Sequence, residues 1–288
     1  MEVRKVKEEL LKLKHISKAF SDKQALKDIN MTLSAGEILG FLGPSGAGKT
    51  TTIKIVTGQM VQSSGEATIL GSDTRRINEQ IYEKIGIVTD ASGVYEEFTV
   101  YENLLLFAQL LNVPKERIDH LLKRVGLVEQ KKQLAGKLSK GQGQRLILAR
   151  AVMHQPKVLF LDEPTSGLDP TTALEIHRLL LELKKDGMGI FLTTHNMEEA
   201  SKLCDHVALL NDGKIVEFGT PQEICLRYNS KKQYRILLNT REKITLAHTV
   251  ENTKKLTEWM TDDLVESIHS CEPTLENVFL TVTGRELS

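Results

Sequence analysis

A glycine-rich segment early in the chain has the residue types and spacing of a phosphate-binding loop. Its residues fit the pattern G-x-x-x-x-G-K-[ST] and are, in order, Gly43, Pro44, Ser45, Gly46, Ala47, Gly48, Lys49, Thr50 and Thr51. Glycines let the backbone N–H groups turn inward around phosphate oxygens, Lys49 adds a positive charge beside the β- and γ-phosphates, and the Thr50 hydroxyl can hold Mg²⁺. The alternative is a glycine-rich turn that caps an ordinary helix. Because an apolar run at 38–42 precedes the loop and a helix is predicted from Thr50, the phosphate site is favoured.

Two further apolar runs end at residues that could do chemistry on a phosphate. The run 158–161 leads to Asp162 and Glu163, and the run 189–193 leads to His195. The carboxyl ends of parallel strands face the crevice where such sheets bind ligands. We therefore expect Asp162 to coordinate Mg²⁺, directly or through water, and Glu163 to accept a proton from the water that attacks the γ-phosphate. A neutral imidazole at His195 could sense the γ-phosphate. Taken alone, the carboxylates could merely cap a helix near Pro164, and the histidine could be structural.

Along the chain, short apolar runs alternate with segments that have a helical pattern. This alternation predicts an α/β fold with a parallel sheet and crossover helices. Between residues 93 and 155 the pattern changes to amphipathic helices, with a capping box formed by Thr99 and Glu102 at the start. A turn at 211–213 predicts a hairpin. From residue 234 on, strands at 234–238 and 243–248 and helices at 253–260 and 274–280 predict a small α+β appendage.

Composition excludes several classes of protein. The 288 residues contain 38 Lys and Arg and 38 Asp and Glu, so there is no net charge for wrapping nucleic acid, and we expect no nucleic-acid partner. The longest apolar stretch, at 104–111, is far shorter than a membrane span. The N-terminal residues 1–14 have no apolar signal region, which predicts a cytosolic chain. The three cysteines are too few and too scattered for a disulfide framework or a zinc site.

The segment 133–142 carries a more specific signal. It reads QLAGKLSKGQ and resembles the signature motif of ATP-binding cassette (ABC) ATPases, whose usual form is Leu-Ser-Gly-Gly-Gln. Ser139, Gly141 and Gln142 match that motif. Ser139 and Gln142 also form a capping box, which by itself would explain their presence at a helix start.

The resemblance to ABC ATPases covers nearly all of residues 10–225. Phe20 resembles the aromatic residue that stacks on adenine, the segment 166–169 with Asp169 resembles the D-loop, and His195 resembles the switch histidine. The resemblance implies a P-loop ATPase domain at 10–225 with a helical subdomain at about 91–155, and the α+β pattern that follows predicts an accessory domain at 234–288. It also implies that ATP and Mg²⁺ are bound, and that the signature helix reaches the γ-phosphate held by a second cassette, either a copy of this chain or a paralogue.

Two residues depart from the pattern of the family. Asp90 stands where the family usually has a glutamine that touches Mg²⁺ and the attacking water. Its carboxylate could still hold Mg²⁺ through water, but it adds negative charge near the phosphates. Lys140 replaces the first signature glycine, where it could strengthen ATP-dependent closure or point to solvent.

The tail at 273–287 resembles the end of cassettes from bacterial ABC-2-type exporters, which move drugs, antimicrobial peptides and similar cargo. This resemblance implies an integral-membrane ABC-2-type permease as partner and a peripheral position on the inner face of the cell membrane. We expect the permease to dock on the helical lobe and the loop from Asp90, where Tyr95 and Phe98 are candidate exposed aromatics. The simpler interpretations are that the tail is an amphipathic terminal helix and that both aromatics are buried.

Two other functions remain open at this point. An importer ATPase shares every catalytic motif and is disfavoured only by the tail. A soluble ABC ATPase acting on ribosomes or chromosomes usually has two cassettes or a long coiled coil, whereas this chain has one phosphate loop, one signature and no heptad tract. The sequence therefore favours an exporter ATPase.

Overall fold

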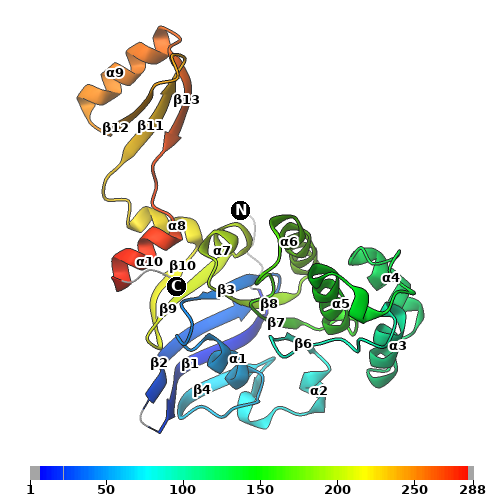
Figure 1. Ribbon diagram of the computed structural model, residues 1–288. Coiled ribbons are helices and arrows are strands. Elements are labelled where there is room, and N and C mark those ends of the chain that lie inside the picture. The colour runs from blue at the N-terminus through cyan, green and yellow to red at the C-terminus, as the bar shows by residue number, and fades with distance from the viewer. Residues whose placement is uncertain (1–6, 22, 285–288) are drawn as a thin grey trace. The chain divides into compact units, whose positions relative to one another are not determined.

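The computed structural model describes residues 7–21 and 23–284, which form two compact units (Figure 1). The first unit ends at Phe218 and the second begins at Gly219. Helix α8 (Pro221–Arg227) packs against helix α10 (Leu275–Thr283) within the second unit. The functional domains at 10–225 and 234–288 stay a prediction.

A six-stranded sheet forms the centre of the first unit, with the strand order β10-β9-β3-β8-β7-β6. Its strands are β3 (Ile38–Leu42), β6 (Ile85–Val88), β7 (Val158–Asp162), β8 (Gly189–Thr194), β9 (His206–Asn211) and β10 (Lys214–Gly219). β3 pairs in parallel with β8 and β9, and β7 pairs in parallel with β6 and β8. Every residue of β3, β7 and β8 is buried, as expected for a parallel sheet covered on both faces. The three predicted strands and the α/β fold are therefore confirmed.

A second, antiparallel sheet was not predicted. It has the order β2-β1-β4-β5, with β2 (Lys23–Ser34), β1 (Glu9–Phe20), β4 (Ser64–Ile69) and β5 (Ser72–Asp73). Helix α1 (Lys49–Val56) contacts β2 and β4 of this sheet and β7 of the parallel sheet. Its apolar residues Ile53, Ile55 and Val56 belong to the same core as Phe41 of β3. This two-sided packing fixes the start of α1 beside the end of β3. A 3₁₀ turn (Thr74–Arg76) and α2 (Glu79–Tyr82) lead from β5 to β6.

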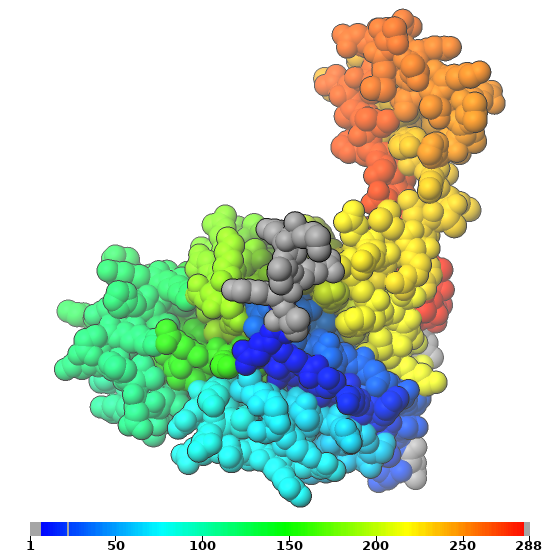
Figure 2. Space-filling view, turned by 180° about the vertical axis from the view of Figure 1, so that it is seen from behind, coloured from blue at the N-terminus to red at the C-terminus, as the bar shows by residue number. Residues whose placement is uncertain are grey.

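The helical lobe predicted between 93 and 155 contains α3 (Val100–Leu110), α4 (Glu116–Arg124), a 3₁₀ turn (Ala135–Lys137) and α5 (Lys140–Val152). The capping box at its start is present, because Glu102 N donates to Thr99 Oγ1 at 3.1 Å and Thr99 N donates to Glu102 Oε2 at 2.8 Å. α3 packs on α4 and α5, and α5 packs on α6 (Pro170–Lys185), which precedes α7 (Met197–Leu203). Figure 2 shows the lobe, in green, and the antiparallel sheet, in blue to cyan, on one continuous surface of the first unit.

The second unit contains a three-stranded antiparallel sheet, which lies between α8 and α10 in the sequence. The strand order is β12-β11-β13, with β11 (Gln233–Leu238), β12 (Lys243–Ala247) and β13 (Val265–Ser270), and α9 (Val250–Thr261) connects β12 to β13. Its small core joins Ile236 and Leu246 of the sheet to Leu256 and Trp259 of α9. Strand β13 was not predicted, and residues 285–287 of the predicted tail lie outside the described residues. Across residues 7–21 and 23–284, no helix is both long and apolar enough to span a bilayer.

Candidate active site

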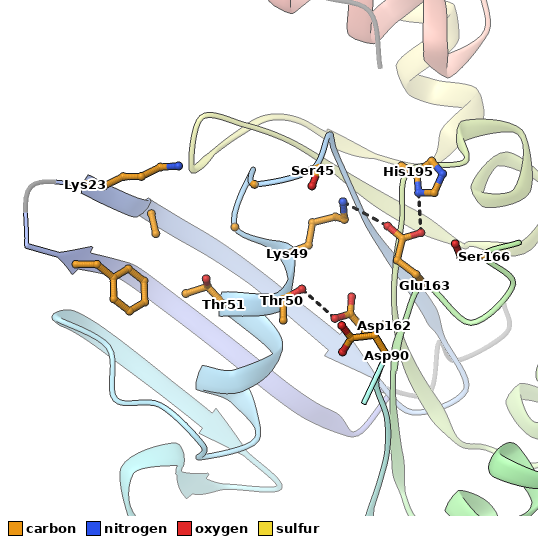
Figure 3. A pocket seen from close by; sticks show the side chains of 14 residues that line it. Lys23, Ser45, Lys49, Thr50, Thr51, Asp90, Asp162, Glu163, Ser166 and His195 are labelled. Atoms are coloured by element: carbon orange, nitrogen blue, oxygen red, sulfur yellow. Dashed lines mark hydrogen bonds and ion pairs between the residues drawn. The ribbon is translucent and has the colours of Figure 1, made fainter. Parts of the chain in front are cut away.

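The parallel sheet brings four polar segments to one edge. β3 runs into the glycine-rich loop, β8 into His195, β7 into Asp162 and Glu163, and β6 toward Asp90. Together these segments line a cavity of about 600 Å³, and Figure 3 shows their side chains pointing into it. The lining residues are Phe20, Lys23, Ala25, Ser45, Gly46, Gly48, Lys49, Thr50, Thr51, Asp90, Asp162, Glu163, Ser166 and His195. Gly43, Pro44 and Ala47 belong to the same loop but do not line the cavity.

The loop requires glycine at Gly48. Its φ is 115°, in the left-handed region, and a Cβ there would lie 2.8 Å from the Ala25 carbonyl oxygen. The loop also holds its own lysine in place. Lys49 is only 9% exposed, and its Nζ donates to the carbonyl oxygens of Gly43 at 2.7 Å and Pro44 at 3.3 Å. A single ammonium group is thereby aimed at the space that the loop encloses.

Asp162 is fixed through both of its carboxylate oxygens. Thr50 Oγ1 donates to Oδ2 at 2.9 Å, and Thr193 Oγ1 donates to Oδ1. The side chain is 7% exposed, so these hydrogen bonds compensate for its burial. The oxygens of Thr50 and Asp162 thus lie side by side at the foot of the cavity, next to Asp90 (Figure 3).

The chemistry of these oxygens fits Mg²⁺. This ion is usually held by one or two carboxylates together with water and substrate phosphates, not by a full cage of protein ligands. A hydroxyl and one or two carboxylates beside a phosphate loop match that description, so Thr50, Asp162 and Asp90 are the residues that would hold the ion.

Glu163 lies between an ammonium group and an imidazole. Its Oε1 is 3.4 Å from Lys49 Nζ, and its Oε2 is 2.8 Å from His195 Nδ1, which is within hydrogen-bond distance. The residue has a φ of 50°, an uncommon backbone state for a side chain with a Cβ. Two backbone hydrogen bonds keep it there, from Glu163 N to the Thr193 oxygen at 3.0 Å and from Ser166 N to the Glu163 oxygen at 3.1 Å. The carboxylate is a quarter exposed and can therefore reach water in the cavity.

Phe20 also lines the cavity. It lies at the end of β1, its side chain is 43% exposed, and Lys18 Nζ is 5.1 Å from its ring centroid. An exposed aromatic face beside a phosphate loop is suited to stacking on a nucleobase. The adenine contact that the family resemblance implies for Phe20 stays a prediction.

The signature residues do not line this cavity. Ser139 caps α5 with Gln142, since Gln142 N donates to Ser139 Oγ at 3.2 Å and Ser139 N donates to Gln142 Oε1 at 3.0 Å. Gly141 faces Thr172 of α6, and the Lys140 ammonium lies over Gly167 of the same chain. Lys140 is itself exposed, so both interpretations of this residue stay predictions.

Asp169 also lies away from the cavity, at the start of α6. Its carboxylate accepts hydrogen bonds from the Thr172 hydroxyl at 2.6 Å and the Thr172 backbone N–H at 3.0 Å, and these bonds lower its pKa. Its observed role is helix capping.

The sequence alone did not identify some residues of the site. Lys23 and Ala25 line the cavity because β2 runs beside the loop, and that sheet was not predicted. Thr193 holds Asp162 because the two residues are paired across β7 and β8. No local pattern marks such a threonine, since its role depends on the register of two strands far apart in the chain.

The fold and the cavity define a P-loop nucleoside triphosphatase with an inserted helical lobe. The family model described as "ABC transporter" matches residues 26–166. The chain is 39% identical to the fluoroquinolones export ATP-binding protein of Mycobacterium tuberculosis, over 92% of this chain and 89% of that protein. It is 38% identical to the bacitracin transport ATP-binding protein BcrA of Bacillus licheniformis, over 72% of this chain and 69% of that protein.

A solved structure leads to the same family. An ATP-binding cassette of an ABC transporter in its ADP conformation matches with a TM-score of 0.69 and 27% identity, covering 77% of this chain and 96% of that chain. The chain therefore belongs to the ABC transporter family and is an ATP-binding ATPase subunit of that family. The resemblance predicted from the signature segment is confirmed.

Proposed function

We propose that this chain hydrolyses ATP to drive a membrane exporter for drugs, antimicrobial peptides or similar cargo. The observation that carries the proposal is its similarity, over 92% of its length, to a protein named for fluoroquinolone export. BcrA, named for bacitracin transport, supports the same kind of cargo. Lys49, the proposed base Glu163 and the proposed Mg²⁺ ligands Thr50 and Asp162 all line the cavity, so the subunit is expected to be an active ATPase.

The residues that line the cavity can be given separate roles in ATP hydrolysis. The loop N–H groups and Lys49 bind the β- and γ-phosphates, and Phe20 stacks on adenine. Glu163 accepts a proton from the attacking water, while His195 holds the Glu163 carboxylate and contacts the γ-phosphate. Thr50 and Asp162 would hold Mg²⁺, with Asp90 acting through water, and the bound ion would neutralise charge on the phosphates.

A second cassette is needed to use the signature residues. Ser139, Gly141 and Gln142 lie at the start of α5 and do not line the cavity of their own chain, so any contact they make with a nucleotide would be with one held by another subunit. We propose that two cassettes, identical or paralogous, close on two ATP molecules. Hydrolysis removes contacts that only the closed state makes, and so it reopens the pair.

The permease is proposed to be an ABC-2-type integral-membrane protein that docks on the helical lobe. Tyr95 and Phe98 are 50% and 40% exposed, and their rings stack with centroids 5.4 Å apart. Asn103 fixes this loop, because it accepts from Tyr95 N and donates to the Tyr95 carbonyl oxygen, both at 2.9 Å. A rigid, exposed aromatic pair is typical of protein interfaces. Docking there would keep the chain on the inner face of the cell membrane.

The proposal is tested by tagging the chain in its native host and extracting membranes in mild detergent. Mass spectrometry then identifies the proteins that co-purify. A stoichiometric polytopic permease, lost when Tyr95 and Phe98 are both changed to Ser, supports the exporter assignment. Recovery only in the soluble fraction, with ribosomal or chromosomal proteins, would overturn it while leaving the ATPase chemistry intact.

A further inference from the structure

Glu199 is a buried carboxylate behind the active site that the proposed mechanism does not use. It lies in the first turn of α7 and is 4% exposed. Three side chains donate hydrogen bonds to it, from Thr165 Oγ1 at 2.6 Å, His177 Nε2 at 2.7 Å and Thr194 Oγ1 at 3.1 Å. A buried carboxylate with three donors is a fully compensated group and not an accident of packing.

Two of the three donors belong to the segments that carry Glu163 and His195. Thr165 is two residues after Glu163, on the loop that follows β7, and Thr194 directly precedes His195 at the end of β8. His177 belongs to α6 and is 15% exposed. One carboxylate therefore ties the loop of the proposed general base, the strand of the histidine and helix α6 to the start of α7.

The adjacent glutamate shows that this arrangement is particular to Glu199. Glu198 is 79% exposed and pairs with Lys202 of its own helix at 2.6 Å. Burial raises the pKa of Glu199, but the hydrogen bonds from His177, Thr165 and Thr194 together lower it by more than burial raises it. The net shift of the pKa is therefore downward. The group is thus an anion at neutral pH, and its acceptor atoms are available to all three donors.

We propose that Glu199 is a positioning residue for hydrolysis, which holds the Glu163 carboxylate and the His195 imidazole at their 2.8 Å separation. This inference rests on the proposed roles of Glu163 and His195. Glu163 has a left-handed backbone, so its carboxylate direction depends on the loop that Thr165 anchors. Without the anchor, small shifts of the base would lower the rate of the chemical step, because misplacement of about 1 Å costs roughly 10²-fold.

The test compares Glu199→Gln with Glu198→Gln in the full chain. A glutamine offers one acceptor oxygen and an N–H₂ group, so it cannot accept from all three donors. We expect kcat for ATP hydrolysis to fall about 10- to 100-fold in Glu199→Gln. KM and the affinity for a fluorescent ATP analogue should stay within about twofold, because the phosphate loop is untouched. Glu198→Gln should match the wild type in all three measurements.

A double variant separates positioning from a purely structural role. Because Glu199 is proposed to act through Glu163, adding Glu199→Gln to Glu163→Gln should lower kcat by less than threefold further. Should Glu199→Gln fail to fold, Thr165→Val removes one donor and is judged by the same criteria. An unchanged kcat, a rise in KM alone, or additive losses in the double variant would overturn the proposal. Full activity of the Glu163→Gln single variant would instead remove the role of Glu163 on which the inference rests.

Discussion

Replacement of Glu163 by glutamine gives the most direct test of the active site. Glutamine has the same shape, and its amide oxygen can still accept from His195 Nδ1, which lies 2.8 Å from Oε2 in the wild type. The fold should therefore be kept. Glutamine cannot take a proton from water, and a positioned general base contributes about 10²- to 10⁴-fold to a rate. We expect kcat to fall by that factor, which corresponds to about 3 to 5 kcal/mol of activation free energy.

Binding should respond in the opposite direction. The substitution removes a negative charge that lies 3.4 Å from Lys49 Nζ and beside the site of the γ-phosphate. Repulsion between the carboxylate and the phosphate is then lost, so ATP affinity should be equal or higher. With hydrolysis blocked, ATP should trap two cassettes together.

The assay measures phosphate release at saturating ATP, together with light scattering in the presence of ATP and of ADP. Glu182→Gln serves as the control, since Glu182 lies in α6, is 57% exposed and is 3.6 Å from Arg124. A kcat of Glu163→Gln within threefold of the wild type would refute the general-base role. A parallel loss of ATP binding would show instead that the substitution damages the site.

Three further changes probe the phosphate loop and the buried network. Lys49→Ala should abolish nucleotide binding in a fluorescence titration, and measurable affinity near the wild-type value would contradict the loop assignment. Gly48→Ala should lower the free energy of unfolding by about 1 to 3 kcal/mol, because alanine is strained at this φ and its Cβ meets a backbone oxygen; an unchanged midpoint in urea would disprove this. Glu199 has a lowered folded pKa, so its stabilisation should be complete above its unfolded pKa of about 4.3 and lost as pH falls through the lower folded value. The difference in free energy of unfolding between the wild type and Glu199→Gln, measured in urea between pH 7 and pH 3, should therefore become smaller as the pH falls. A difference that stays constant would contradict the lowered pKa.

The parts of the fold that were predicted have strong local signals. β3, β7 and β8 are continuous apolar runs that end at polar residues, and the loop between β3 and α1 has a fixed pattern. The antiparallel sheet lacks such a signal. β1 has several shifts in its register with β2, and His15 has a positive φ, so its buried and exposed residues do not alternate regularly. A period-two pattern cannot be recognised where bulges interrupt it.

The site shows the same contrast between local and tertiary information. Lys49 and Asp162 were identified because their positions within a loop and at a strand end are encoded locally. Glu198 and Glu199, in contrast, look equivalent in the sequence as the acidic start of a helix. Only the packing of α7 on the sheet distinguishes them, by burying one and leaving the other exposed. A helix of seven residues is too short for the periodicity of its sequence to show which glutamate is buried.

The attachment of the three-stranded sheet in the second unit has a consequence for how such chains diverge. The polypeptide leaves α8 and returns to α10 through adjacent connections, with Cys271 N donating to the Gln233 oxygen at 2.9 Å, while α8 and α10 contact each other directly. Neighbouring entry and exit points are the geometry at which whole segments are gained or excised without disturbing the host. We therefore expect homologous cassettes to differ here by exchange or deletion of the entire segment 233–270, while the flanking helices α8 and α10 are retained.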